Sequence, residues 1–229
     1  NRILGPYLNE AGFLLGDGAS VGQIDAQAKQ FGMPMGPLEV SDSVGLDTAL
    51  KVTRATAEAM GVDIQTDDRT QFLAWLVEDN GRVGRKAGKG FYDYNEKGKP
   101  ERLWPDLNTR IDVTVDECPP ELKQHYINRL LIRQAIEVAR CFEEGVITDA
   151  RDGDIGSILA WGFAPYTGGC CSYVDLIWGI KPFVEEAKKM EEKYGERFAV
   201  PQLLKDMAEK GEGFYDRFPP GGVKAKEAA

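Results

Sequence analysis

The stretch NRILGPYLNEAGFLLGDGASVGQIDAQAKQFGMPMGPLEVSDSVG, residues 1–45, decides the fold, because a weaker version of it returns later in the chain. The second version occupies residues 128–179. Five pairs of positions keep one spacing of 127 residues: Asn1 and Asn128, Arg2 and Arg129, Glu10 and Glu137, Gly18 and Gly145, and Asp25 and Asp152. Self-similarity at a fixed period predicts a duplicated structural unit.

The two versions also correspond outside this register. The second carries a few extra residues, after which Asp175 stands where the first has Asp42. Both versions are followed by the same sequence GFYD, which contains two aromatic residues, at residues 90–93 and 213–216. We therefore predict two tandem helical domains, residues 1–96 and 120–229, joined by a linker at 97–119 and frayed from about residue 217.

Apolar residues recur at three- and four-residue steps over most of the chain, which is typical of amphipathic helices. Glycines and prolines mark where these helices end or begin. The predicted helices cover residues 3–15, 21–30, 37–45, 47–60, 71–78, 120–144, 149–161, 172–178, 181–194 and 201–210, and a strand-like segment covers 111–115. Asp47 and Thr148 are predicted to cap two of the helices. The fold class is therefore mainly α.

Charge and cysteine usage narrow the functional class. A net charge of −9 argues against a nucleic-acid partner. The chain has no apolar run of about 18 residues, so no membrane span is predicted. Its four cysteines lack CxxC spacing, so neither a metal site nor a disulfide framework is predicted, and a reducing, intracellular setting is favoured.

The residues alone do not identify a reaction. The chain contains no GxGxxG, P-loop or GxSxG motif, and its one histidine, His125, fits a surface or packing position better than a catalytic one. It begins with Asn1 rather than methionine, and the helical pattern is already running by Ile3. We therefore expect a fragment of a longer protein.

Four motifs of the first half resemble the C-terminal helical domain of 3-hydroxyacyl-CoA dehydrogenases: NRILGPYLNEA, FGMPMGP, LEVSDSVGLD and GRKAGKGFYDY. EEGVITDARDGD, WGFAPYTGG and the closing GFYD resemble the divergent second copy of that domain in multifunctional fatty-acid β-oxidation enzymes. In such enzymes an enoyl-CoA hydratase module comes first and an NAD-binding Rossmann domain second. The resemblance implies that the two helical domains follow them.

The resemblance also implies the chemistry. That family oxidises a 3-hydroxyacyl-CoA to the 3-ketoacyl-CoA with NAD, and its catalytic histidine and glutamate belong to the Rossmann domain. The functional residue that carries over is Asn1, whose amide would hydrogen-bond the reacting oxygen or the catalytic histidine, with a simple helix cap as its alternative role. Asn128 keeps the residue type but is expected to be a structural relic. Alone, the fragment is expected to be inactive.

Two further groups of residues follow from the resemblance. Pro34, Met35, Gly36 and Pro37 are expected to wall the acyl or pantetheine side of the substrate pocket, with core packing as the alternative for Met35. The second version departs from this turn, which argues against a second active site. Arg2 and Arg129 are expected to be structural, with Glu10 and Glu137 as their candidate partners.

The resemblance has consequences for assembly. The second copy is expected to take the place of a dimer partner, giving a monomer that is a pseudo-dimer. Expected partners are the acyl-CoA substrate, the Rossmann and hydratase domains and a thiolase subunit. The expected compartment is the bacterial cytoplasm, with peroxisome and mitochondrion as alternatives. Two other functions stay open: a non-catalytic module that docks partners such as a thiolase, and a helical domain of another Rossmann-linked hydroxy-acid dehydrogenase.

Overall fold

The computed structural model describes residues 2–61, 63, 67–112 and 118–221. The chain divides into two compact units. The unit called here the α6 unit contains residues 1–10, 29–34 and 121–229, and the α4 unit contains residues 11–28 and 35–120. Helices α1 (Leu4–Gly16) and α2 (Val21–Phe31) contribute residues to both.

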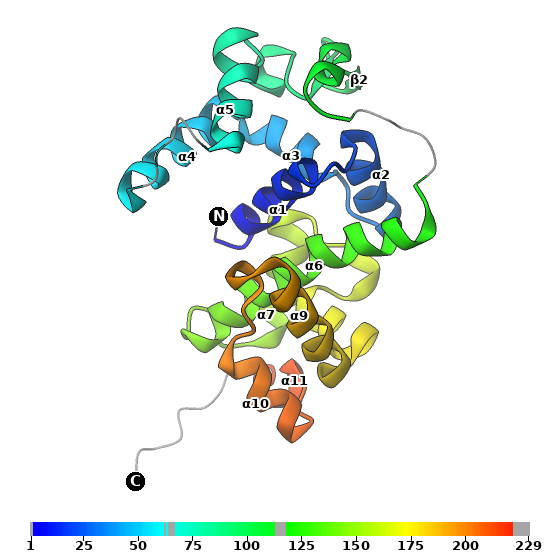
Figure 1. Ribbon diagram of the computed structural model, residues 1–229. Coiled ribbons are helices and arrows are strands. Elements are labelled where there is room, and N and C mark those ends of the chain that lie inside the picture. The colour runs from blue at the N-terminus through cyan, green and yellow to red at the C-terminus, as the bar shows by residue number, and fades with distance from the viewer. Residues whose placement is uncertain (1, 62, 64–66, 113–117, 222–229) are drawn as a thin grey trace. The chain divides into compact units, whose positions relative to one another are not determined.

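The α4 unit is built from short helices and one small sheet (Figure 1). Its further elements are α3 (Pro37–Val44), α4 (Leu46–Met60), α5 (Asp68–Ala74), the π-helical η1 (Trp75–Asp79), the 3-10 turns η2 (Arg85–Ala87) and η3 (Pro105–Thr109), and strands β1 (Tyr92–Tyr94) and β2 (Pro100–Leu103). The strands are antiparallel, with Tyr92 opposite Leu103. Buried Leu76 and Leu107 lie in its core, and the Trp75 and Trp104 rings stack 5.2 Å apart.

Helix ends in this unit follow from particular residues. Asp67 caps α5 by accepting a hydrogen bond from the Thr70 amide, and Gly61 ends α4 in the left-handed conformation. The predicted cap at Asp47 is wrong, because Gly45 is the N-cap and Asp47 lies in the first turn of α4, paired with Lys86 at 2.8 Å. An acidic side chain in a first turn is stabilising without capping.

The α6 unit is organised around the long helix α6 (Pro120–Glu143), the green helix in Figure 1. Its other elements are α7 (Ala150–Trp161), η4 (Pro165–Thr167), α8 (Cys170–Ser172), the π-helical η5 (Tyr173–Trp178), α9 (Ile180–Tyr194), η6 (Glu196–Phe198), α10 (Gln202–Lys210) and α11 (Phe214–Arg217). Helix α6 is buried over several faces, including Leu131, Ile132 and Ile136. A helix that is apolar around most of its circumference belongs inside a core.

The mainly α fold class is confirmed, with one two-stranded sheet in the described part of the chain. The predicted cap Thr148 is wrong by one residue, because Asp149 caps α7. Part of the segment predicted as a linker forms β2 and η3. The strand-like segment predicted at 111–115 reaches into residues 113–117, and the predicted frayed tail into 222–229, both outside the described residues.

Each unit contains a buried aspartate that accepts two successive backbone amides. Asp25 accepts from Leu38 and Glu39 at 2.9 and 3.0 Å. Asp154 accepts from Cys171 and Ser172 at 2.7 and 3.0 Å. A tyrosine hydroxyl also donates to each: Tyr92 to Asp25 at 2.8 Å and Tyr215 to Asp154 at 2.9 Å. By its contacts, Asp154 and not the exposed Asp152 corresponds to Asp25.

A second aspartate in each unit holds the closing aromatic segment. Asp42 accepts from the amides of Phe91 and Tyr92 at 2.8 and 3.0 Å. Asp175 accepts from the amides of Phe214 and Tyr215 at 2.8 and 3.1 Å. This agrees with the pairing of Asp42 and Asp175 made from the sequence. The duplication itself stays a prediction, now accompanied by the same hydrogen-bond arrangement in both units.

Candidate functional site

The residues predicted to form the site differ in accessibility. Asn1 lies outside the described residues. Pro34 is exposed and Met35 is half-buried, whereas Gly36 and Pro37 are buried. Pro34 and Met35 therefore have side-chain surface that a ligand can reach, and Gly36 and Pro37 shape the backbone beneath.

In the α4 unit, Asp25 fixes the buried part of this loop. Pro37 is the first residue of α3, and the next two amides donate to the Asp25 carboxylate. A carboxylate at a helix N-terminus satisfies amides that have no partner within the helix. A methyl group at Gly36 would overlap the Asp25 carboxyl group, so only glycine fits there. Sequence reasoning identified the loop but not Asp25 as its anchor.

In the α6 unit, the preceding residues of the loop rest on the segment WGFAPYTGG. The Phe31 ring lies 5.4 Å from the Tyr166 ring and 6.0 Å from the Tyr173 ring, centroid to centroid. Gly32 has φ of 111°, and a side chain there would come within 3.1 Å of the Tyr166 ring. Aromatic packing and a glycine turn thus hold the residues before Pro34, a contact that sequence reasoning missed because nothing local encodes it.

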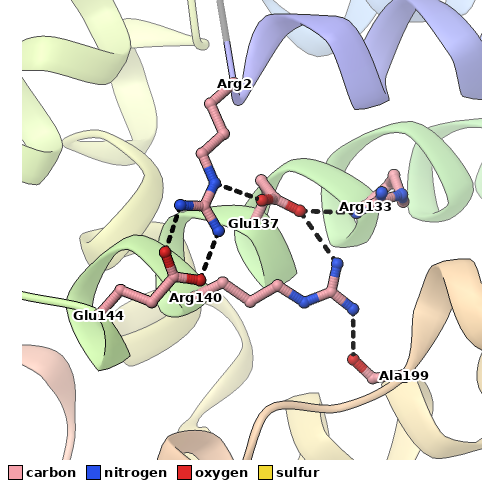
Figure 2. Close-up of polar contacts among 6 residues, drawn as sticks. All are labelled: Arg2, Arg133, Glu137, Arg140, Glu144 and Ala199. Carbon is pink, nitrogen blue, oxygen red and sulfur yellow. Dashed lines mark hydrogen bonds and ion pairs between the residues drawn. The ribbon is translucent and has the colours of Figure 1, made fainter. Parts of the chain in front are cut away.

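Arg2 anchors the start of the chain to α6. Its guanidinium Nε donates to Glu137 Oε1 at 2.9 Å, and its Nη2 donates to Glu144 Oε1 at 2.6 Å. Figure 2 shows the Arg2 side chain reaching from the first residues of the chain between these two carboxylates. Planar, two-pronged binding of carboxylates is the geometry for which arginine is suited.

Glu137 is shared between several guanidinium groups. Arg140 Nη1 lies 3.0 Å and Arg133 Nη1 3.4 Å from Glu137 Oε2 (Figure 2). Arg140 also donates to the Ala199 carbonyl at 2.9 Å. Burial alone would raise the pKa of Glu137, but its hydrogen bonds to Arg2 and Arg140 outweigh this and lower it. Glu137 therefore stays ionised at neutral pH.

A second ion pair links α1 and α6, with the glutamate on α1 and the arginine on α6. Arg129 and Glu10 are both 1% exposed, and Arg129 Nε donates to Glu10 Oε1 at 2.7 Å. The other carboxylate oxygen accepts from Arg197 Nε at 3.0 Å. The Arg129 guanidinium also stacks on the Tyr194 ring, 4.2 Å from its centroid. The predicted partners of Arg2 and Arg129 are confirmed: Glu137 and Glu10.

His125, Cys170 and Cys171 of this unit have packing roles. Tyr194 is hydrogen-bonded to His125 Nε2 at 2.9 Å, which agrees with the packing role predicted for that histidine. Burial raises the pKa of the Cys170 and Cys171 thiols well above the usual value, so they stay protonated and unreactive. The ion pairs of Arg2 and Glu10 can position the start of α1.

Comparisons with known proteins agree with the resemblance. Residues 1–94 match the sequence profile of the family described as 3-hydroxyacyl-CoA dehydrogenase, C-terminal domain. The chain is 38% identical over 218 residues to the fatty acid oxidation complex subunit alpha of Shewanella loihica, covering 94% of the chain and 30% of that relative. The chain thus spans about a third of the length of this curated relative.

Two solved structures share the fold. One is the dehydrogenase part of multifunctional enzyme 1 from C. elegans, with a TM-score of 0.63 and 26% identity over 90% of this chain and 46% of that one. The other is 3-hydroxybutyryl-CoA dehydrogenase from Escherichia coli K12, with a TM-score of 0.59 and 19% identity over 92% of this chain and 59% of that one. Residues 1–94 thus match the family of 3-hydroxyacyl-CoA dehydrogenase C-terminal domains, and the whole chain resembles the corresponding part of a fatty acid oxidation complex alpha subunit.

Proposed function

We propose that this chain is the C-terminal helical part of an NAD-dependent 3-hydroxyacyl-CoA dehydrogenase of fatty-acid β-oxidation. The observation that carries the proposal is the 38% identity to a fatty acid oxidation complex alpha subunit across 94% of the chain. The helical part supplies one wall of the substrate cleft and the surface on which the Rossmann domain closes. NAD and the catalytic histidine–glutamate pair belong to that Rossmann domain, outside these 229 residues.

Asn1 is the residue of this chain proposed to touch the reacting atoms. Its amide donates a hydrogen bond to the substrate oxygen or to the catalytic histidine, which holds the near-attack geometry. Arg2, the next residue, is bound by Glu137 and Glu144. We assign Arg2 a positioning role, because its ion pairs with Glu137 and Glu144 hold the residue that follows Asn1 in the sequence.

Pro34 and Met35 are proposed to contact the acyl or pantetheine chain. Both have accessible surface, and both are apolar, as a pocket for an acyl chain requires. Gly36 and Pro37 complete the proposed wall through the backbone that Asp25 holds. Acyl-CoA is therefore the proposed substrate class, and the bacterial cytoplasm the proposed compartment.

We also propose that residues 1–96 and 120–229 are two copies of one domain that form a pseudo-dimer. In a two-fold interface, residue i contacts j and residue j contacts i. Arg2 and Glu10 stand 127 positions before Arg129 and Glu137, and Arg2 binds Glu137 while Arg129 binds Glu10. This exchange supports the proposal, together with the matched aspartates of the two units.

A second role, docking of a partner such as a thiolase, is favoured by exposed apolar side chains of the α6 unit. Leu159 on α7 is 80% exposed and Leu176 on η5 is 78% exposed. Each is a large apolar side chain that a partner chain could cover. This role adds to the dehydrogenase proposal and does not replace it.

A chimera tests the proposed function. The residues of the Shewanella loihica relative that precede its own helical part are joined to this chain, and NADH formation from a 3-hydroxyacyl-CoA is measured. The proposal predicts turnover by the chimera and none by the 229-residue chain alone. Turnover by the isolated chain, or a folded chimera that binds NAD but oxidises nothing, would contradict it. Co-purification with a thiolase that depends on Leu159 and Leu176 would establish the docking role.

A further inference from the structure

One segment of this acidic chain has the opposite charge. The chain contains 28 basic and 37 acidic residues, yet residues 81–102 contain seven basic and three acidic ones. This segment forms the loop around η2, the two strands and the turn between them, all within the α4 unit. A local field of this sign attracts anions even when the protein as a whole repels them.

Three of the seven basic residues already have carboxylate partners. Arg82 and Arg102 both pair with Asp93, and Lys86 pairs with Asp47. The other four are Arg85, Lys89, Lys97 and Lys99, here called the basic cluster. All four are exposed, and no ion pair compensates them among the residues that the structure describes. The remaining acidic residues of the segment, Glu96 and Glu101, are exposed as well.

The backbone brings the basic cluster together. A side chain at Gly98 would come within 3.2 Å of Arg85 Nε and 3.4 Å of Nη2, so the guanidinium lies over Gly98, between Lys97 and Lys99 in the sequence. The backbone of Lys89 pairs with that of Gly84, the residue before Arg85. Arg85 is thus held beside a turn that carries two further positive charges.

This turn is fixed rather than free to spread its charges. The Asn95 side chain accepts from the amides of Lys97 and Lys99 at 3.0 and 3.1 Å, and Gly98 has φ of 68°. Like charges gathered in a fixed turn repel each other, and a bound anion removes that cost. A planar guanidinium over a turn that carries a lysine on each side of Gly98 in the sequence offers charge and donors for a phosphate, which carries up to two charges and three acceptor oxygens.

We propose that the basic cluster binds the phosphate monoester of a nucleotide. Coenzyme A, which carries a 3′-phosphate, is the nucleotide expected here, and this identification rests on the proposed function. The site itself does not, because phosphate binding by these four side chains is measurable whatever reaction the parent enzyme catalyses.

The test is a titration of the 229-residue chain with coenzyme A, dephospho-coenzyme A and inorganic phosphate at low ionic strength, followed by amide NMR shifts. We expect coenzyme A to shift the amides of residues 85, 89 and 97–99, and to bind about tenfold more tightly than dephospho-coenzyme A, which lacks the 3′-phosphate. Arg85→Gln/Lys97→Gln/Lys99→Gln is expected to abolish the shifts and leave the thermal unfolding curve unchanged.

The matched control removes three lysines from another basic place, the groove of about 370 Å³ between α9 and α10, as Lys181→Gln/Lys188→Gln/Lys205→Gln. It is expected to bind coenzyme A like the unchanged chain. Gly98→Ala, which displaces the Arg85 guanidinium without removing charge, is expected to weaken binding. Equal loss in the control and the cluster variant, or equal binding of coenzyme A and dephospho-coenzyme A, would overturn the proposal. A chimera without dehydrogenase activity that still binds phosphate through the basic cluster would overturn only the proposed function.

Discussion

Arg2 at the start of the chain and Glu137 in the middle of α6 form an ion pair, 2.9 Å between Nε and Oε1. Glu137 also neutralises Arg133 and Arg140, so it is the one carboxylate shared by three guanidinium groups in Figure 2. Glu10 plays the matching part for Arg129. The start of α1 is thereby tied to α6 from both directions.

Glu137→Gln removes the shared negative charge and leaves three arginines close together. Their repulsion, with poorer hydrogen bonding, is expected to lower Tm by about 5 °C. Circular dichroism melts measure this. The control, Glu186→Gln, breaks the exposed pair with Lys189 and is expected to change Tm by less than about 1 °C. Equal shifts in the two variants would show that Glu137 has no special role.

Glu10→Gln leaves the buried Arg129 guanidinium without a full counter-charge. Breaking a buried ion pair from one side is expected to cost about 3 kcal/mol, measured by urea unfolding. Glu10→Leu/Arg129→Met removes both charges, and much of the lost stability is expected to return. A single variant that loses less than about 1 kcal/mol would contradict this assignment.

Gly36→Ala places a methyl group where the Asp25 carboxyl group lies. The carboxylate must move away from the amides of Leu38 and Glu39, so we expect a loss of about 2 kcal/mol and weaker protection of those amides in hydrogen exchange. The matched control is Gly156→Ala in α7, where a methyl group meets nothing within 4 Å. There alanine is expected to stabilise by about 0.5–1 kcal/mol.

Asp42 gives the α4 unit a pH-dependent stability. Burial raises its pKa from 3.8 to about 6, even though it accepts hydrogen bonds from Tyr92, Phe91 and Tyr94 and faces Arg82. Between about pH 4 and 6, the folded state holds a proton that the unfolded chain has released. The free energy of unfolding should therefore fall as the pH rises through this window, by about 2–3 kcal/mol for this group.

The measurement is urea unfolding at pH 4.5 and 7, compared with Asp42→Asn. Other carboxyl groups titrate in the same pH window. The quantity compared is therefore the change in the free energy of unfolding between pH 4.5 and 7, in the unchanged chain and in Asp42→Asn. The variant is expected to be less stable at both pH values, since an amide cannot accept all the hydrogen bonds that Asp42 accepts. An equal change in the two proteins would mean that Asp42 does not titrate as described.

Much of the architecture followed from local sequence signals. Helices α6, α9 and α10 begin and end within about one residue of the predicted bounds, because glycine, proline and apolar spacing act locally. The sequence also predicted the partners of Arg2 and Arg129, because both arginines and both glutamates recur at the spacing of 127 residues.

Other features depended on contacts that no local signal encodes. The spacing of 127 residues pairs Asp25 with Asp152 in the sequence. The hydrogen bonds of Asp25 instead match those of Asp154. The extra residues of the second version therefore begin before this aspartate. The packing of Phe31 on Tyr166 joins two segments over 130 positions apart, and β2 lies in a segment without periodicity. Such features arise from tertiary packing.

The central claim is that this chain contributes Asn1 to the oxidation of a 3-hydroxyacyl-CoA. The most direct measurement is kcat for NADH formation by the chimera carrying Asn1→Ala, with Asn128→Ala as the matched control. We expect Asn1→Ala to lower kcat by about 100-fold or more with the KM for NAD unchanged, and Asn128→Ala to leave kcat within about twofold. An Asn1→Ala chimera that folds, binds NAD and keeps its full kcat would contradict the claim.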